Sequence, residues 1–127
     1  MTVAEQLSAL SAILAQRRIH SLFQPIMCLS EHRVFGHEAL SRGPSNSPLH
    51  SPIPLFAVAR QRGRLSELEL ACRESACRRF SELQLPGKLF LNISPESLLE
   101  ASHQPGRDLI GGFNGLWVLA PGWHARR

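Results

Sequence analysis

The stretch GHEALSRGP, residues 36–44, places a glutamate and an arginine four positions apart inside a segment that otherwise has the pattern of a buried strand. Alternation along a strand puts Glu38, Leu40 and Arg42 on one face. At a rise of about 3.3 Å per residue, the Cα atoms of Glu38 and Arg42 would lie roughly 13 Å apart. A salt bridge at a strand end is one interpretation. This separation is long for a direct ion pair, so it favours two charged groups that lie on either side of something else.

A second apolar run, residues 22–29, comes just before this strand, which we place at residues 33–42. Only three residues, 30–32, separate the two runs, too few for the crossover that parallel neighbours require. The sequence therefore predicts an antiparallel hairpin. Within the uncertainty of register, Gln24 would then lie near Glu38, and a polar cluster would form at one end of the pair.

Helix starts are indicated by two capping boxes, Thr2 with Glu5 and Ser66 with Glu69, because each pairs a hydroxyl residue with a glutamate three positions later. Residues 44–54 contain four prolines and are expected to form a loop. Two helices should follow this loop before the next strand.

The segment KLFLNIS, residues 88–94, has the pattern of a buried strand interrupted by one amide, Asn92. An amide at the carboxyl end of a core strand, directly before a helix capped by Ser94, lies where α/β barrels carry functional groups. The alternative is a core asparagine bonded to the backbone. The sequence leaves both interpretations open.

The net charge of +4 comes from thirteen arginines and one lysine against ten acidic residues. The arginine pairs and runs have no interleaved aromatic residues, which favours a solvated basic face over a surface for a nucleic-acid polymer. We expect no nucleic-acid partner.

Three cysteines without CxxC spacing argue against a disulfide scaffold and a structural zinc site, and favour a reducing compartment. No apolar run approaches the roughly 20 residues that a membrane span needs. We expect a cytoplasmic protein without a membrane span.

Three blocks, FQPI (23–26), GHEALSRGP (36–44) and LFLNISPESL (89–98), resemble the first signature blocks of the EAL domain, a family of bacterial phosphodiesterases that linearise cyclic di-GMP. Their order and spacing fit from about residue 21 to residue 99. The resemblance implies an α/β fold, a TIM-like (β/α)8 barrel whose first strand runs antiparallel to the others.

The resemblance also implies roles for individual residues. Glu38 and Asn92 match the family's metal ligands, for Mg²⁺ or Mn²⁺, and such cations prefer carboxylate and amide oxygens. Arg42 matches the arginine that contacts the substrate phosphate, and its planar fork suits that task. Gln24 and Leu40 match residues that line the dinucleotide site.

The sequence departs from the family after the third block, because the ExTE and DDFG blocks and the later lysine strand are not found. We therefore divide the chain into an amino-terminal amphipathic helix (1–20), a partial EAL domain (21–100) and an atypical tail (101–127). An incomplete barrel with only its first three strands is expected, and its third strand would have a bare edge. An Asn-Gly turn in the tail could supply a substitute hairpin.

The catalytic set is thus incomplete, and we expect a cyclic di-GMP phosphodiesterase that is truncated and inactive alone. The alternative is a degenerate EAL binding or regulatory module that acts through contacts with a protein partner or a second copy of the chain.

Overall fold

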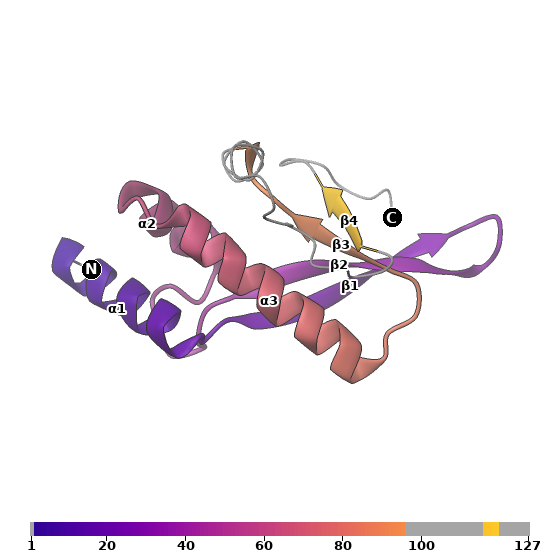
Figure 1. Ribbon diagram of the computed structural model, residues 1–127, viewed down its shortest axis with the longest axis horizontal. Coiled ribbons are helices and arrows are strands. Elements are labelled where there is room, and N and C mark those ends of the chain that lie inside the picture. Colours follow the sequence, from indigo (N-terminus) through magenta and orange to yellow (C-terminus); the bar gives the residue numbers. More distant parts are fainter. Residues whose placement is uncertain (1, 96–115, 120–127) are drawn as a thin grey trace, which may run out of the picture. The chain divides into compact units, whose positions relative to one another are not determined.

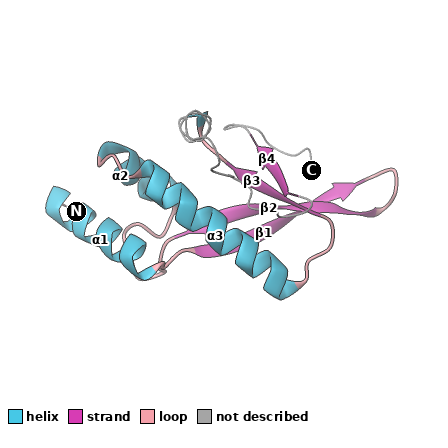
Figure 2. Cartoon of the chain, viewed as in Figure 1, coloured by secondary structure: helices cyan, strands magenta, loops and turns pink. Residues whose placement is uncertain are grey.

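The computed structural model of the protein describes residues 2–95 and 116–119 (Figure 1). The described part of the chain combines helices with a sheet in an α/β arrangement (Figure 2). In chain order, the elements are α1 (Val3–Gln16), β1 (His20–Cys28), β2 (Arg33–Arg42), α2 (Pro52–Gln61), α3 (Leu65–Leu83), β3 (Lys88–Asn92) and β4 (Leu116–Leu119). None of the described helices is both long and apolar enough to cross a membrane.

The strands form one sheet in the order β1-β2-β3-β4. β1 and β2 are neighbours joined by a four-residue turn, so they run antiparallel as predicted. β3 lies parallel to β2, with Gly36 opposite Lys88 and Glu38 opposite Phe90. The antiparallel first strand and the parallel second and third strands that the sequence predicts are confirmed.

The tail contributes a strand that the sequence analysis did not assign. β4 lies parallel to β3, with Leu89 opposite Leu116 and Asn92 opposite Leu119. The predicted bare edge of β3 is therefore wrong, because β4 satisfies the backbone groups on that side. The four residues of β4 pair with β3 in parallel, whereas the Asn114-Gly115 turn proposed for a hairpin lies outside the described residues.

The described residues belong to two compact units, Met1–Leu22 with Leu40–Ala76, and Phe23–Ala39 with Cys77–Arg127. The first unit has a continuous apolar core from α1, α2 and the first half of α3. Its fully buried side chains include Leu10, Leu49, Leu55 and Leu68. Leu10, Ile13 and Leu14 of α1 pack into this core, whereas Val3 and Leu7 are exposed.

In the second unit, one face of β2 packs on the last turns of α3. The ring of Phe80 lies 6.0 Å from that of His37 and 5.8 Å from that of Phe23, measured between centroids. Leu89 and Leu91 of β3 are also buried. Because β2 has helix-packed residues at odd positions, Glu38 is left on the opposite face, as strand alternation requires.

The helix starts follow the sequence signals only in part. In α1, Glu5 N–H donates to Thr2 Oγ1 and Thr2 N–H donates to the Glu5 carboxylate, each at 3.1 Å, which confirms the capping box. The second capping box is wrong, because α3 already begins at Leu65 and Ser66 lies inside its first turn. There Arg64 binds Glu67 at 2.9 Å, while Glu69 is buried.

The predicted loop, residues 44–54, extends too far toward the carboxyl end, because its last three residues belong to a helix. α2 begins at Pro52, and a proline suits this position because the first helical N–H groups have no partner within the helix. The helix ends at Arg62 as C-cap, and the following Gly63 has a left-handed φ of 68°. A glycine directly after the cap is common, because glycine adopts the left-handed conformation without steric cost.

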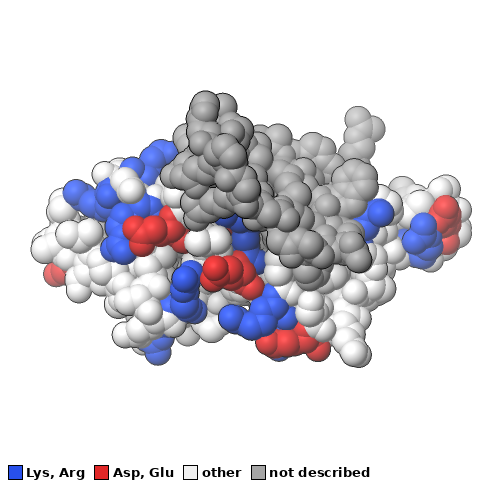
Figure 3. Space-filling view, in the orientation of Figure 1, with Lys and Arg blue, Asp and Glu red and all other residues white. Residues whose placement is uncertain are grey.

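The ion pairs of each unit lie at the surface, with basic and acidic side chains interspersed on the face seen in Figure 3. In the first unit, Arg17 pairs with Glu74 at 3.1 Å. In the second, Glu82 pairs with Arg79 at 3.3 Å. These side chains are about half exposed, so each pair contributes little stability.

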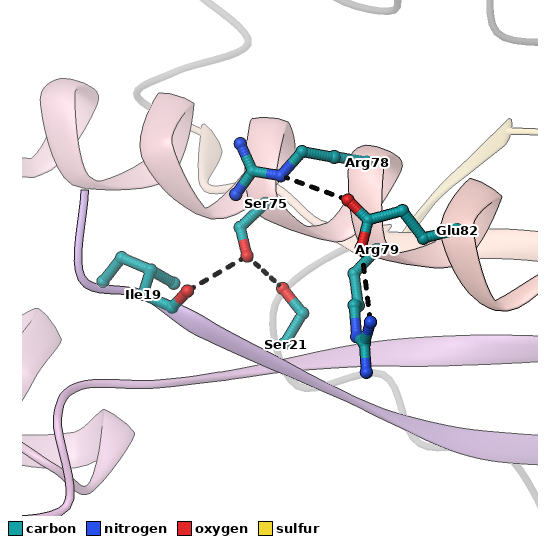
Figure 4. A network of polar contacts seen from close by, with 6 residues as sticks. All are labelled: Ile19, Ser21, Ser75, Arg78, Arg79 and Glu82. Atoms are coloured by element: carbon teal, nitrogen blue, oxygen red, sulfur yellow. Dashed lines mark hydrogen bonds and ion pairs between the residues drawn. The ribbon is translucent and has the colours of Figure 1, made fainter.

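A buried hydroxyl network fixes the start of β1 to the middle of α3 (Figure 4). Ser75 Oγ donates to the carbonyl of Ile19 at 3.2 Å and lies 2.8 Å from Ser21 Oγ. Because Ser75 has one hydroxyl proton, Ser21 is the donor in the second bond. The Ser75 hydroxyl thus gives a partner to the carbonyl of the residue just before β1.

Candidate functional site

The candidate site is centred on Glu38 in the middle of β2. Its side chain is only 7% exposed, although it carries a carboxylate. A buried carboxylate is costly unless it is hydrogen-bonded or holds a cation. The register places Glu38 directly opposite Phe90 of β3, on the face away from the His37–Phe80 contact.

Asn92 is the last residue of β3 and provides the partner of that carboxylate. Its Nδ2 donates to Glu38 Oε2 at 3.2 Å. A carboxylate accepts only, so the amide must turn its nitrogen to Glu38, which leaves Oδ1 as an acceptor. The amide of Asn92 is therefore bonded to the Glu38 side chain, and its role as a metal ligand stays a prediction.

The close approach of β2 and β3 depends on a glycine two positions before Glu38. A Cβ atom at Gly36 would lie 2.5 Å from the Lys88 carbonyl oxygen and 2.7 Å from a ring carbon of Phe90. With no side chain here, the Phe90 ring can cover this position. Glu38 and Asn92 are thereby brought within hydrogen-bonding distance.

The donor set fits a hard divalent cation only in part. Glu38 and Asn92 offer two oxygen ligands of the kind that Mg²⁺ and Mn²⁺ prefer. Within residues 2–95 and 116–119, no group of three His, Cys, Asp or Glu side chains could hold a metal ion. These residues can therefore contribute to one cation, but they do not provide the ligands of a two-metal centre.

The other three predicted site residues lie on β1 and β2, and each is half-buried. Gln24 is half-buried on β1, in the same unit as Glu38, and has a polar or packing partner. Leu40 and Arg42 lie further along β2 in the first unit and are also half-buried. Arg42 Nη1 donates to the carbonyl of Ser41 at 3.0 Å.

One buried polar residue beside the site was not singled out from the sequence. His37 is 7% exposed, and its Nδ1 has no hydrogen-bond partner in the described part of the chain. Its ring meets Phe80 edge-on, at an interplanar angle of 65°. The sequence did contain a signal for this residue. His37 lies between Gly36 and Glu38 on a strand predicted to be buried, and a histidine is unusual on a face that packs against a helix.

Solved structures of EAL domains have a fold similar to that of this chain. The FimX EAL domain of Xanthomonas citri, in complex with c-diGMP, aligns over 94% of this chain and 50% of its own, with a TM-score of 0.69 and 21% identity. Klebsiella pneumoniae BlrP1, in a manganese/cy-diGMP complex, aligns over 70% of this chain and 21% of its own, with a TM-score of 0.55 and 28% identity.

A third similar structure is Vibrio cholerae LapD, an S helix-GGDEF-EAL protein bound to c-di-GMP. It aligns over 81% of this chain and 27% of its own, with a TM-score of 0.62 and 12% identity. No curated protein sequence matches the chain. The chain thus spans about half the length of the FimX EAL domain.

The family profile of the EAL domain matches residues 6–108, which is most of the sequence. The match includes β1, β2 and β3 and therefore all the candidate site residues. The fold is part of the TIM-like barrel of these proteins. The protein belongs to the EAL domain family.

Proposed function

We propose that this protein binds cyclic di-GMP through the amino-terminal part of an EAL site and does not hydrolyse it alone. The observation that carries the proposal is the contact between the buried Glu38 carboxylate and the Asn92 amide at the carboxyl end of β3. Ligand sites in α/β barrels lie at this end of the strands. The cyclic di-GMP complexes of FimX and BlrP1 support the choice of ligand.

In this proposal, each candidate residue has a chemical task. Arg42 supplies a cationic fork for a phosphate of the dinucleotide, a geometry that a lysine does not offer. Gln24 donates or accepts hydrogen bonds at the ligand's polar edge. Leu40 provides an apolar contact for a ring.

Glu38 and Asn92 would hold a divalent cation, Mg²⁺ or Mn²⁺, which supplies charge neutralisation at the phosphate and an acidified water. The manganese complex of BlrP1 supports this cation class. Phosphodiester hydrolysis by two metals requires ligands for both the attacking and the leaving oxygen. One carboxylate and one amide favour binding without turnover.

Binding and turnover are tested together on the full chain. Purified protein is titrated with cyclic di-GMP by calorimetry with and without Mn²⁺, and the mixtures are then analysed by chromatography for the linear dinucleotide. We expect saturable binding and no linear product. Arg42→Ala should weaken binding roughly tenfold or more, as expected for a lost charge-assisted bond.

Arg42→Lys is the matched control, because it keeps the charge and removes the fork. It should recover only part of the lost affinity. Linear product that disappears in Glu38→Ala would contradict the proposed lack of hydrolysis. Equal affinities of wild-type protein and Arg42→Ala would contradict the proposed phosphate contact.

A second candidate function is a regulatory module that docks on a protein partner. Two large apolar residues on α1, Val3 and Leu7, are 57% and 42% exposed, and the chain spans half of the FimX domain. Light scattering after size-exclusion chromatography would support this candidate if it gave a defined complex that Leu7→Gln dissolves. A monomer at all concentrations tested would contradict self-association.

A further inference from the structure

The loop that follows Arg42 is closed by one residue, His50. β2 ends at Arg42, and both backbone polar groups of the next residue, Gly43, contact His50. Gly43 N–H donates to the His50 carbonyl at 2.9 Å, and the His50 ring nitrogen Nδ1 lies 2.9 Å from the Gly43 carbonyl oxygen. The two ends of the loop, residues 43–50, are therefore joined by a reciprocal pair of hydrogen bonds.

The bond to the ring determines which nitrogen of His50 carries a proton. A carbonyl oxygen only accepts hydrogen bonds, so Nδ1 is the donor. His50 is exposed, and an exposed ring gains little from apolar burial. The hydrogen bond to Gly43 is therefore the main contribution of this side chain to the loop.

The interior of the loop is also ordered. Ser47 N–H donates to the Pro44 carbonyl at 3.0 Å, and Leu49 N–H donates to Ser47 Oγ at 3.0 Å. The Leu49 side chain is fully buried in the core of the first unit. A Cβ atom at Gly43 would overlap the Leu49 carbonyl oxygen, so the closed loop requires glycine there. Compact loops whose ends lie close together frequently carry function.

Arg42 is the residue whose backbone this closure holds. The Gly43 N–H belongs to the planar peptide unit that joins Arg42 to Gly43, so its bond to His50 fixes the orientation of that unit. Arg42 is half-buried, and its Nη1 donates to the Ser41 carbonyl at 3.0 Å. A guanidinium has several further N–H donors that can bind a phosphate. A backbone that is already fixed lowers the entropy lost on binding.

We propose that His50 is a positioning residue for Arg42. Its Nδ1–H closes the loop 43–50, which holds the peptide unit after Arg42 in one orientation and presents the guanidinium to a phosphate group. The inference rests on the proposed function for the identity of the phosphate ligand, and on the contacts of His50 for the closure. It gives an exposed histidine a role in ligand affinity.

Two substitutions of similar shape separate the hydrogen bond from the size of the side chain. In His50→Asn, the amide nitrogen is bonded to Cγ, as Nδ1 is in histidine, and can donate to the Gly43 carbonyl. His50→Leu has the same branching as asparagine but no donor. Each full-length chain is titrated with cyclic di-GMP by calorimetry, and the amide hydrogen exchange of Gly43 is measured by NMR without ligand.

We expect the Gly43 amide of His50→Leu to exchange roughly tenfold faster than that of the wild type, as the loss of one hydrogen bond predicts. The affinity of His50→Leu for cyclic di-GMP should fall about fivefold. His50→Asn should stay within about twofold of the wild type in both measurements, because the donor is kept. If His50→Leu fails to fold by circular dichroism, His50→Ala takes its place, with the same losses expected.

Two results would overturn the proposal. Unchanged affinity in His50→Leu, despite faster exchange at Gly43, would mean that the closure serves the loop alone. Equal losses of affinity in His50→Leu and His50→Asn would mean that the ring, and not its donor, is required.

Failure of this inference can be distinguished from failure of the proposed function. If the wild-type chain does not bind cyclic di-GMP, inorganic pyrophosphate is the probe, and the NMR signal of the Arg42 Nε–H reports its binding. Weaker pyrophosphate binding in His50→Leu than in the wild type and His50→Asn would support the positioning role without the proposed ligand. An Arg42 signal that does not respond to pyrophosphate would reject it. Equal binding of cyclic di-GMP by all three proteins would support the proposed function and reject this inference.

Discussion

At the scale of single residues, Gly36 determines how closely β2 approaches β3 beside the site. Any larger side chain would meet the Lys88 carbonyl, which is backbone and cannot rotate away, as well as the Phe90 ring. Steric overlap of this kind forces shifts in packed strands. The Glu38–Asn92 contact therefore depends on a residue that carries no chemistry of its own.

We predict that Gly36→Ala lowers the free energy of unfolding by about 1–3 kcal/mol, measured by urea denaturation. Gly63→Asn is the control, because a Cβ at Gly63 meets nothing within 4 Å and asparagine tolerates the left-handed backbone. Its change should stay within about 0.5 kcal/mol. Equal losses of stability in the two variants would contradict the predicted clash at Gly36.

Cys72, in the core of the first unit, predicts a pH dependence. Burial raises the pKa of its thiol from 9.0 to about 11, with a hydrogen bond from Ser41 acting in the opposite direction. Between these values the unfolded chain loses a proton that the folded chain keeps, so stability falls as pH rises. The two-unit shift corresponds to at most about 3 kcal/mol.

Urea unfolding of wild-type protein and Cys72→Ala from pH 8 to pH 11 checks this expectation. The alanine variant has lower stability at pH 8 because of the cavity, but it should show a shallower decline, since the titrating thiol is gone. Parallel curves for the two proteins would rule out Cys72 as the source of the decline.

At the scale of elements, β1 and β3 avoid a bare edge in different ways. β1 contains Pro25, which has no N–H to offer to an incoming strand. β3 is covered by β4. β3 is thereby paired on both sides, and the four-residue β4 is the edge strand on that side of the sheet.

We predict that a chain ending at Gly115 aggregates, because β3 then presents unpaired backbone groups. A chain ending at Ala120 keeps β4 and is the matched control. Static light scattering over hours at 25 °C should rise for the shorter chain and stay flat for the longer one. The same scattering from both would show that β4 does not protect the β3 edge.

At the scale of the whole molecule, the charges contribute more to solubility than to stability. The pairs Arg17–Glu74 and Arg79–Glu82 have side chains about half exposed, and exposed pairs contribute about 0–1 kcal/mol each. The net charge of +4 is modest for 127 residues. Apolar burial, as in the Leu10, Leu55 and Leu68 core, is therefore the main source of stability.

We expect the free energy of unfolding in urea to change by less than about 1 kcal/mol between 0.1 and 1 M NaCl, because surface ion pairs are weak and screened. Arg17→Gln should show the same salt dependence as wild type. A salt-induced loss well above this limit would show that the ion pairs stabilise the fold more than their exposure allows.

The sequence predicted most of the elements because local signals agreed with the fold. The bounds of β2 match the prediction, and the Thr2–Glu5 capping box is confirmed. Ser66 and Glu69 have the spacing of a capping box but do not form one. Arg64 binds Glu67 at the helix start, and Glu69 is buried. Such competition is decided by packing, which a motif of four residues does not contain.

The sequence by itself determined the family, the hairpin and the residue types of the site, since spacing and chemistry are written in the order of the chain. Only the tertiary structure decided that Asn92 turns its amide to Glu38, that Gly36 permits this approach, and that the tail returns as β4 beside β3. The reason is physical: each of these facts joins residues that are far apart in the sequence. Their pairing depends on register and sterics between strands, and these exist only once the chain has folded.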